Sequence, residues 1–176
     1  MSIITALALI ALVLMLAGWT KGFLRPNRIF HLANVAEGQS LHGLKTYTAV
    51  STGSLRYLIA KLGATPLNAD IAGQADEPLG IFTDQPTAGD PIAVALLGAA
   101  EGTQKVAINS AVADGDLLTP DANGYARTLP AANGTYWVFG RATLPTTPAA
   151  AGDTIEFIPR SPVKATVNAG VITLGF

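Results

Sequence analysis

The dipeptide Gly-Asp recurs in this chain at the end of a turn, each time just before a short apolar run. The three copies are residues 88–90, 114–116 and 151–153. Glycine adopts a positive φ without steric cost, and aspartate can accept hydrogen bonds from the nearby backbone. Each copy therefore predicts a tight corner that feeds a strand. Their recurrence predicts a mainly β fold, either a small β-barrel or a sandwich, with polar corners.

The composition supports this fold class. The chain has 176 residues, of which 18 are Gly and 11 are Pro, and its apolar runs are short. This pattern is typical of strands and turns rather than helices. Only 13% of the residues are charged, which is unfavourable for the solubility of a monomer. Partner subunits that cover part of the surface would remove this difficulty.

Apolar and β-branched runs between turn signals predict the strands. The expected strands are residues 45–50, 55–61, 79–82, 91–97, 105–108, 117–119, 124–128, 135–139 and 154–158. Residues 65–77 are expected to form a polar loop, and the tail, residues 163–176, to pair with a neighbour. Asn123-Gly124 and Asn133-Gly134 are expected at tight turns.

A weak internal repeat relates residues 80–94 to residues 140–157. In both copies a strand is expected to end at a glycine, Gly80 or Gly140. A Thr- and Pro-containing loop follows, and Gly-Asp then opens a second strand.

Residues 3–18 form an uncharged apolar run, followed by Trp19 and Lys21. Its Leu, Ala and Met residues favour a helix of roughly 24 Å, and we assign residues 1–24 to an N-terminal apolar helix. Three interpretations compete. A signal peptide is disfavoured because no basic residue precedes the run. The second interpretation is a membrane anchor at residues 3–19. The basic residues that follow it would then place the bulk of the chain on the cytoplasmic side. A helix buried in an oligomeric assembly fits equally well.

Charge is distributed unevenly along the chain. Residues 1–61 contain six basic residues and one acidic residue, a net charge of +5, whereas residues 62–176 contain five basic and eleven acidic residues, a net charge of −6. The asymmetry is either a chance result in a sparsely charged chain, or a sign that the N-terminal part faces an acidic surface such as lipid headgroups or another protein. We assign residues 25–76 to a basic arm with the first strands. No nucleic acid is expected as a partner, because the basic residues are scattered. The candidate assembly contacts are Trp19, Lys21, Arg25 and Arg28.

No residue pattern in the chain predicts catalysis. There is no Cys, and His31 and His42 lack acid–base or metal-binding partners at recognisable spacing. A turn is the simpler interpretation of residues 114–116 than a cation site, and of Asn133-Gly134-Thr135 than a glycosylation acceptor. We therefore expect no enzyme activity, no cofactor and no metal.

A carbohydrate-binding domain, or an enzyme of unrecognised type, is the third class of function. Tyr125, Tyr136 and Trp137 can line a sugar site, although core packing is the simpler explanation for them.

Residues 77–167 resemble the capsid cement, or decoration, proteins of tailed bacteriophages. The matching phrases are Pro78-Leu-Gly-Ile-Phe82, Ala88-Gly-Asp-Pro-Ile92, Ala113-Asp-Gly-Asp-Leu-Leu118, Asn123-Gly124, Gly134-Thr-Tyr-Trp-Val-Phe-Gly140, Ala149-Ala-Ala-Gly-Asp153, Ile155-Glu-Phe-Ile-Pro159 and Pro162-Val-Lys164. The order and spacing of these phrases carry more information than any one of them.

The resemblance implies a non-enzymatic, cement-like β-domain over residues 77–176. Such proteins are small and β-barrel-like, sit on the outer surface of the capsid, often as trimers, and clamp neighbouring major capsid subunits. The implied partners are the major capsid protein and, in a homotrimer, further copies of this chain. The apolar run and basic stretch up to Lys61 depart from the family pattern, and a membrane is the alternative partner of residues 3–19.

Overall fold

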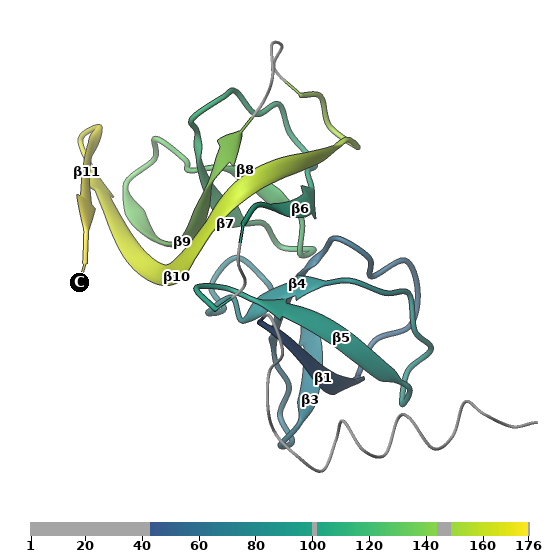
Figure 1. Cartoon of the computed structure of the whole chain (residues 1–176). Coiled ribbons are helices and arrows are strands. Elements are labelled where there is room, and N and C mark those ends of the chain that lie inside the picture. Colours follow the sequence, from purple (N-terminus) through teal and green to yellow (C-terminus); the bar gives the residue numbers. More distant parts are fainter. Residues whose placement is uncertain (1–42, 100–101, 144–148, 176) are drawn as a thin grey trace, which may run out of the picture. The chain divides into compact units, whose positions relative to one another are not determined.

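The computed structural model describes residues 43–99, 102–143 and 149–175, and within these ranges every regular element is a β-strand (Figure 1). The strands form a closed five-stranded barrel and a six-stranded sheet. The prediction of a mainly β fold with a small barrel is confirmed. The predicted N-terminal helix and the arm up to residue 42 lie outside the described residues.

The barrel is built from the first five strands. These are β1 (Leu44–Ala49), β2 (Ile59–Leu62), β3 (Asn68–Ile71), β4 (Gly80–Phe82) and β5 (Pro91–Leu96). Their order around the barrel is β1-β3-β2-β4-β5, and β1 closes it by pairing antiparallel with β5. The pairing of β1 with β3, in which Thr48 lies opposite Asn68, is parallel. The predicted domain boundary at residue 77 falls between β3 and β4, which both belong to the barrel.

The barrel interior follows from the alternation of side chains along its strands. In β1 the buried residues are Tyr47 and Ala49, and in β5 Ile92 and Val94 are almost fully buried. They pack with Phe82 and with small residues such as Ala60 and Ala69 in one apolar cluster. Small residues on facing strands leave room for the aromatic rings inside so narrow a barrel.

The six remaining strands form the sheet. They are β6 (Gln104–Ala107), β7 (Leu117–Pro120), β8 (Ala126–Thr128), β9 (Gly134–Thr143), β10 (Thr154–Asn168) and β11 (Val171–Leu174). β10 is the long strand that sweeps across Figure 1. Its register on β9 shifts between Pro159 and Val163. The first part of β10 also pairs with β6, and the last part with β11.

The sheet contributes to two apolar clusters. Ile155 and Phe157, early in β10, pack with Phe139, whose ring meets Phe157 edge-on at 5.3 Å between centroids. Ala165 and Val167, late in β10, belong to a separate cluster. The first cluster also contains barrel residues, among them Ile59, Ile81 and Leu97. Barrel and sheet therefore share apolar packing in addition to the covalent connection.

Two of the strand expectations are wrong. Residues 55–58 form a turn rather than the start of a strand: the Leu58 amide donates to the Leu55 carbonyl at 2.9 Å, and Tyr57 has φ +69°. The expected polar loop 65–77 contains β3, in which Ala69 is fully buried. β3 alternates polar and apolar residues over only the four residues Asn68-Ala-Asp-Ile71, too short a run to predict a strand, and its pairing with β1 and β2 identifies it as one.

The turn expectations were half right. Asn123-Gly124 forms the β7–β8 turn, with Gly124 at φ +81°. Asn133-Gly134 does not close a hairpin, because β8 and β9 both pair with β7. The Asn133 side chain instead accepts a hydrogen bond from the Ala169 amide at 2.8 Å.

The C-terminal tail forms a hairpin, in which β11 pairs antiparallel with the end of β10. Its two-residue turn is Ala169-Gly170, with φ values of +49° and +80°. Positive φ at both central positions defines a type I′ turn, for which Asn-Gly is the favoured sequence. Ala169 is therefore an unfavourable residue at this position.

We predict that Ala169→Asn stabilises the protein by about 0.5–1 kcal/mol, because Asn tolerates the left-handed conformation better than Ala. Urea denaturation followed by circular dichroism measures the change. Ala131→Asn is the matched control, since Ala131 is exposed and not among the residues with positive φ. Equal effects of the two substitutions would contradict the explanation.

Candidate functional site

The three Gly-Asp corners form the same hydrogen-bonded unit. In each, the glycine amide donates to the carbonyl of one residue on a neighbouring segment, and the amide of that residue donates back to the Asp carbonyl. The partner residues are Ala49 for Gly89-Asp90, Ile108 for Gly152-Asp153 and Ala142 for Gly115-Asp116, with N···O distances of 2.8–3.0 Å. All three partners are buried, with at most 2% of their surface exposed. Each corner is thus hydrogen-bonded to one buried residue, which is Ala49 in β1, Ala142 in β9 or Ile108 directly after β6.

The corner backbone requires glycine. Gly89, Gly115 and Gly152 have φ between +81° and +94°, a region that residues with a Cβ rarely adopt. The predicted corners are therefore confirmed as local structures.

The Asp side chains differ between corners. Asp116 and Asp153 fold back onto the turn, where their carboxylates accept from the amides of Ala113 and Ala150 at 2.9 and 2.8 Å. Asp116 also accepts from the Thr128 hydroxyl at 2.8 Å. Asp90 shares the backbone bonds but makes no such side-chain bond to the described residues. The carboxylates therefore fix turns, and residues 114–116 form a turn as predicted.

The internal repeat is confirmed in the pairing of the strands. Gly80 in β4 lies opposite Leu96 of β5, and Gly140 in β9 lies opposite Pro159 of β10. A Cβ on Gly80 would collide with the Val94 side chain and the Ala95 carbonyl, and one on Gly140 would collide with Phe157 and the Ile158 carbonyl. The expectation that a strand ends at each glycine is wrong. Gly80 begins β4, and Gly140 lies within β9.

A buried carboxylate that the sequence analysis missed fastens the β7–β8 hairpin. Asp121, 5% exposed, accepts from the amides of Asn123 and Tyr125 at 2.7 and 2.8 Å and from the side-chain amide of Asn109. The signal in the sequence is an Asp two residues before Asn-Gly, the spacing at which its side chain reaches the turn amides. With three donors satisfied, Asp121 is a structural residue.

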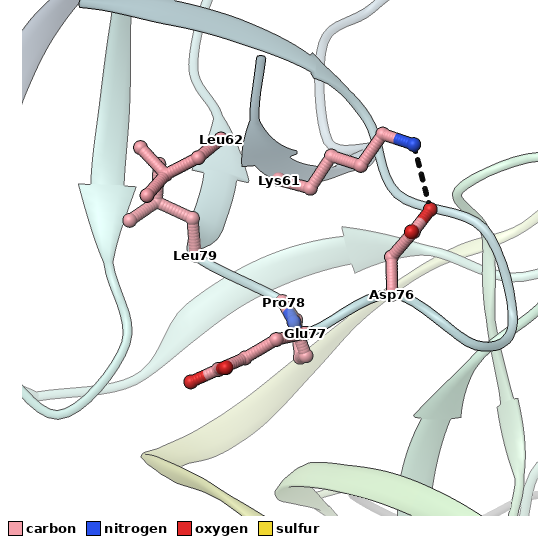
Figure 2. Close-up of a pocket in the computed structure, with 6 residues that line it drawn as sticks. All are labelled: Lys61, Leu62, Asp76, Glu77, Pro78 and Leu79. Carbon is pink, nitrogen blue, oxygen red and sulfur yellow. Dashed lines mark hydrogen bonds and ion pairs between the residues drawn. The ribbon is translucent and has the colours of Figure 1, made fainter. Parts of the chain in front are cut away.

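A hollow of about 360 Å³ lies beside the barrel and is shown in Figure 2. It is lined by Lys61, Leu62, Asp76, Glu77, Pro78 and Leu79. Lys61 Nζ and Asp76 Oδ2 form an ion pair at 2.7 Å, drawn as the dashed line. In the figure, Leu62 and Leu79 lie on one side of the hollow, and Glu77 points away from the ion pair.

The ion pair shifts the pKa of both Asp76 and Lys61. The hydrogen bond from Lys61, followed by one from the Gly73 amide, lowers the pKa of Asp76, and the bond to Asp76 raises the pKa of Lys61. Both side chains are about one-third exposed, so solvent screens the interaction and its contribution to stability is below about 1 kcal/mol. The hollow has a polar wall whose two charges neutralise each other.

The four candidate assembly contacts, Trp19, Lys21, Arg25 and Arg28, lie outside the described residues, as do His31 and His42. Of the aromatic residues, Tyr136 is 8% exposed and donates its hydroxyl to the Ala132 carbonyl at 3.2 Å, and Tyr125 packs against the barrel cluster. Trp137 lies under the Lys164 ammonium at 5.1 Å. The three rings are thus engaged in three different contacts.

Within the described residues, no group of three or more His, Cys, Asp or Glu side chains is placed to hold a metal ion. The same part of the chain contains no helix long and apolar enough to cross a membrane.

Comparisons with known proteins find similarity among solved structures but not among sequences. No protein-family profile and no curated protein sequence matches the chain. Among solved structures, the chain is similar to the head fiber gp8.5 N base of bacteriophage phi29, with a TM-score of 0.48 and 21% sequence identity. The match covers 67% of this chain and 93% of that chain. The structural neighbour is thus a phage head fiber protein, and at this level of similarity no residue roles transfer from it.

We predict that Asp116→Ala and Asp153→Ala each destabilise the protein by about 1 kcal/mol, because each leaves a turn amide without its acceptor. Asp90→Ala is the matched control. It removes the same side chain from an equivalent corner without losing a side-chain bond, so its effect should stay below about 0.5 kcal/mol. Urea midpoints at pH 7 provide the comparison. A loss for Asp90→Ala as large as for the other two would contradict the role of the carboxylates.

We predict that Asp76→Asn makes stability less sensitive to acid. A carboxyl group whose pKa is lower in the folded state stabilises the fold above its unfolded pKa of about 4. This stabilisation is lost as the pH falls through the folded pKa. Urea titrations from pH 7 to pH 2 should therefore show a shallower decline for Asp76→Asn than for the wild type. The control is Glu77→Gln, which removes a charge from the same hollow and leaves the ion pair intact. An unchanged slope for Asp76→Asn would contradict the assignment.

Proposed function

We propose that this chain is a structural protein of a tailed-phage virion, a decoration subunit that binds the outer surface of the assembled head shell and stabilises it. The observation that supports the proposal is the recurrence of the Gly-Asp corners. The Gly-Asp phrases within the resemblance to cement proteins form one repeated hydrogen-bonded unit. In two of them the Asp116 and Asp153 carboxylates accept hydrogen bonds from amides of their own turns. Such corners build a rigid scaffold, which is what a binding subunit needs.

The mechanism is mass action, without catalysis or a cofactor. A subunit that binds only the assembled shell stabilises it by RT ln(1 + [L]/Kd) at each site, about 2.7 kcal/mol when its free concentration is 100 times Kd. Repetition over many sites makes the total large although each contact is modest. The proposed partners are the major capsid protein and, in a homotrimer, two further copies of the chain.

A membrane-anchored β-domain is the second candidate, favoured by the uncharged run at residues 3–18. Carbonate extraction of expressing cells separates the two candidates. Release of the chain into the soluble fraction excludes an integral anchor, whereas retention in the membrane pellet together with absence from particles would replace the virion proposal.

We expect the purified full chain to co-sediment with heads that lack it, to saturate, and to raise the temperature at which those heads release DNA. Mass spectrometry of purified virions should find the chain in many copies. A chain absent from virions and unbound by shells would contradict the proposal.

The basic candidate contacts are tested within the same assay. Lys21→Gln, Arg25→Gln and Arg28→Gln combined should weaken shell binding about tenfold, if each cation contributes about 0.5 kcal/mol. The control is Lys105→Gln with Arg141→Gln, which removes exposed cations from the sheet. An equal loss in both variants would indicate a general charge effect rather than a contact at residues 21–28.

A further inference from the structure

The connection between β2 and β3 presents apolar side chains to solvent. Leu62 is 61% exposed and Leu67 is 50% exposed, and Ala64 and Pro66 between them are also exposed. None of residues 62–67 is charged. We call this segment the β2–β3 tip. Single exposed leucines are ordinary, but an uncharged tip that exposes two of them is a candidate contact surface.

Leu67 is in a conformation that its side chain disfavours. Its φ is +63°, in the left-handed region, where Gly and Asn are preferred and Leu is strained. Burial does not compensate for the strain, because half of the Leu67 surface is exposed. Neither the backbone nor the core therefore explains a leucine at this position. An unfavourable residue kept in an exposed loop points to a role outside the fold.

The tip is held in a single shape. The Thr48 amide donates to the Leu67 carbonyl at 2.8 Å, which ties the tip to β1. Asn68 donates through its side chain to the Thr65 hydroxyl and accepts at its carbonyl from the Gly63 amide, both at 2.8 Å. A Cβ on Gly63 would come within 2.8 Å of the Asn68 Cβ, so the two sides of the tip are in close contact. A contact surface of fixed shape loses little conformational entropy on binding.

The charges around the tip define what it can bind. Leu62 borders the hollow, where the neighbouring cation Lys61 is already paired with Asp76. Glu77, which also lines the hollow, is exposed and lies outside the ion pair. Residues 62–67 themselves are uncharged, so the tip offers no free cation of the kind that lipid headgroups or nucleic acid require. Its complement is an uncharged apolar recess on a protein.

We infer that Leu62 and Leu67 are anchor residues that insert into an uncharged apolar recess on a subunit of the assembled shell. The inference rests on the proposed function and adds the surface that makes the contact. Two leucines buried from exposed positions are the kind of compact apolar anchor that dominates binding in protein interfaces. The strain at Leu67 is then retained because the leucine contributes more to binding than it costs in folding stability.

The test combines a binding assay with a stability measurement on the full chain. Leu62→Ser with Leu67→Asn should weaken binding to shells by about 10- to 100-fold. Leu67→Asn alone should raise the unfolding midpoint by about 2–4 °C, because it relieves the left-handed strain. A core residue would show the opposite, a loss of stability. Leu62→Ser alone provides a second variant free of any change at the strained position.

The matched control is Val171→Ser with Ile172→Ser, which removes two apolar side chains from exposed positions in β11. Binding by this variant should stay within twofold of the wild type. Equal binding by the tip variant and the wild type would overturn the inference, as would an equal loss in the control. A wild-type chain that does not bind shells would instead contradict the proposed function itself.

Site-specific crosslinking identifies the occupant directly. The chain has no Cys, so Leu67→Cys carries a single benzophenone maleimide without further changes. On illumination with shells, the expected product is a covalent adduct with a shell subunit. An adduct with a second copy of this chain, or with lipid in a vesicle control, would overturn the assignment.

Discussion

The reciprocal pair of backbone hydrogen bonds between a Gly-Asp corner and one buried residue on a neighbouring segment underlies much of this structure. Each corner leaves its turn with a free amide and a free carbonyl, and a single residue such as Ala49 or Ala142 satisfies both. A buried polar group without a partner is costly, so the corner also fixes where the following strand begins. Because the unit occurs in the barrel and in the sheet, one local device orients β5, β7 and β10.

Features that depend on neighbouring residues were predictable from the sequence, whereas features that depend on distant residues were not. The corners were predictable because a positive φ and an Asp that accepts a nearby amide are properties of four consecutive residues. β3 was not, because its alternation of polar and apolar residues covers only four residues, and pairing with β1 and β2 makes this segment a strand. The turn at residues 55–58 was missed for a similar reason: the Tyr57 amide and carbonyl bond to Phe82 and Ala107, both distant in sequence.

The candidate functional residues also differ in how far they could be predicted from the sequence. Exposure of Leu62 and strain at Leu67 arise from a loop whose shape is fixed by Thr48 on another strand, and no pattern in residues 62–67 indicates either property. The role of Asp121 could be predicted from its neighbours, since the amides that it accepts from belong to the turn at Asn123-Gly124. The regular corners and the strained tip thus have different roles. The corners make the scaffold stiff, and the tip places apolar side chains where the scaffold does not use them.

The parallel pairing of β1 with β3 has a kinetic consequence. β1 is bonded to β3 and β5 and not to β2, its neighbour in sequence. The pairing of Leu44 with Ala95 joins residues that are far apart in the chain. Contacts of this separation must close a long loop before they gain any stabilisation. During synthesis the barrel therefore stays open until β5 has left the ribosome. The edge of β1 that pairs with β5 is unpaired in that interval, which is the stage at which neighbouring nascent chains can associate wrongly.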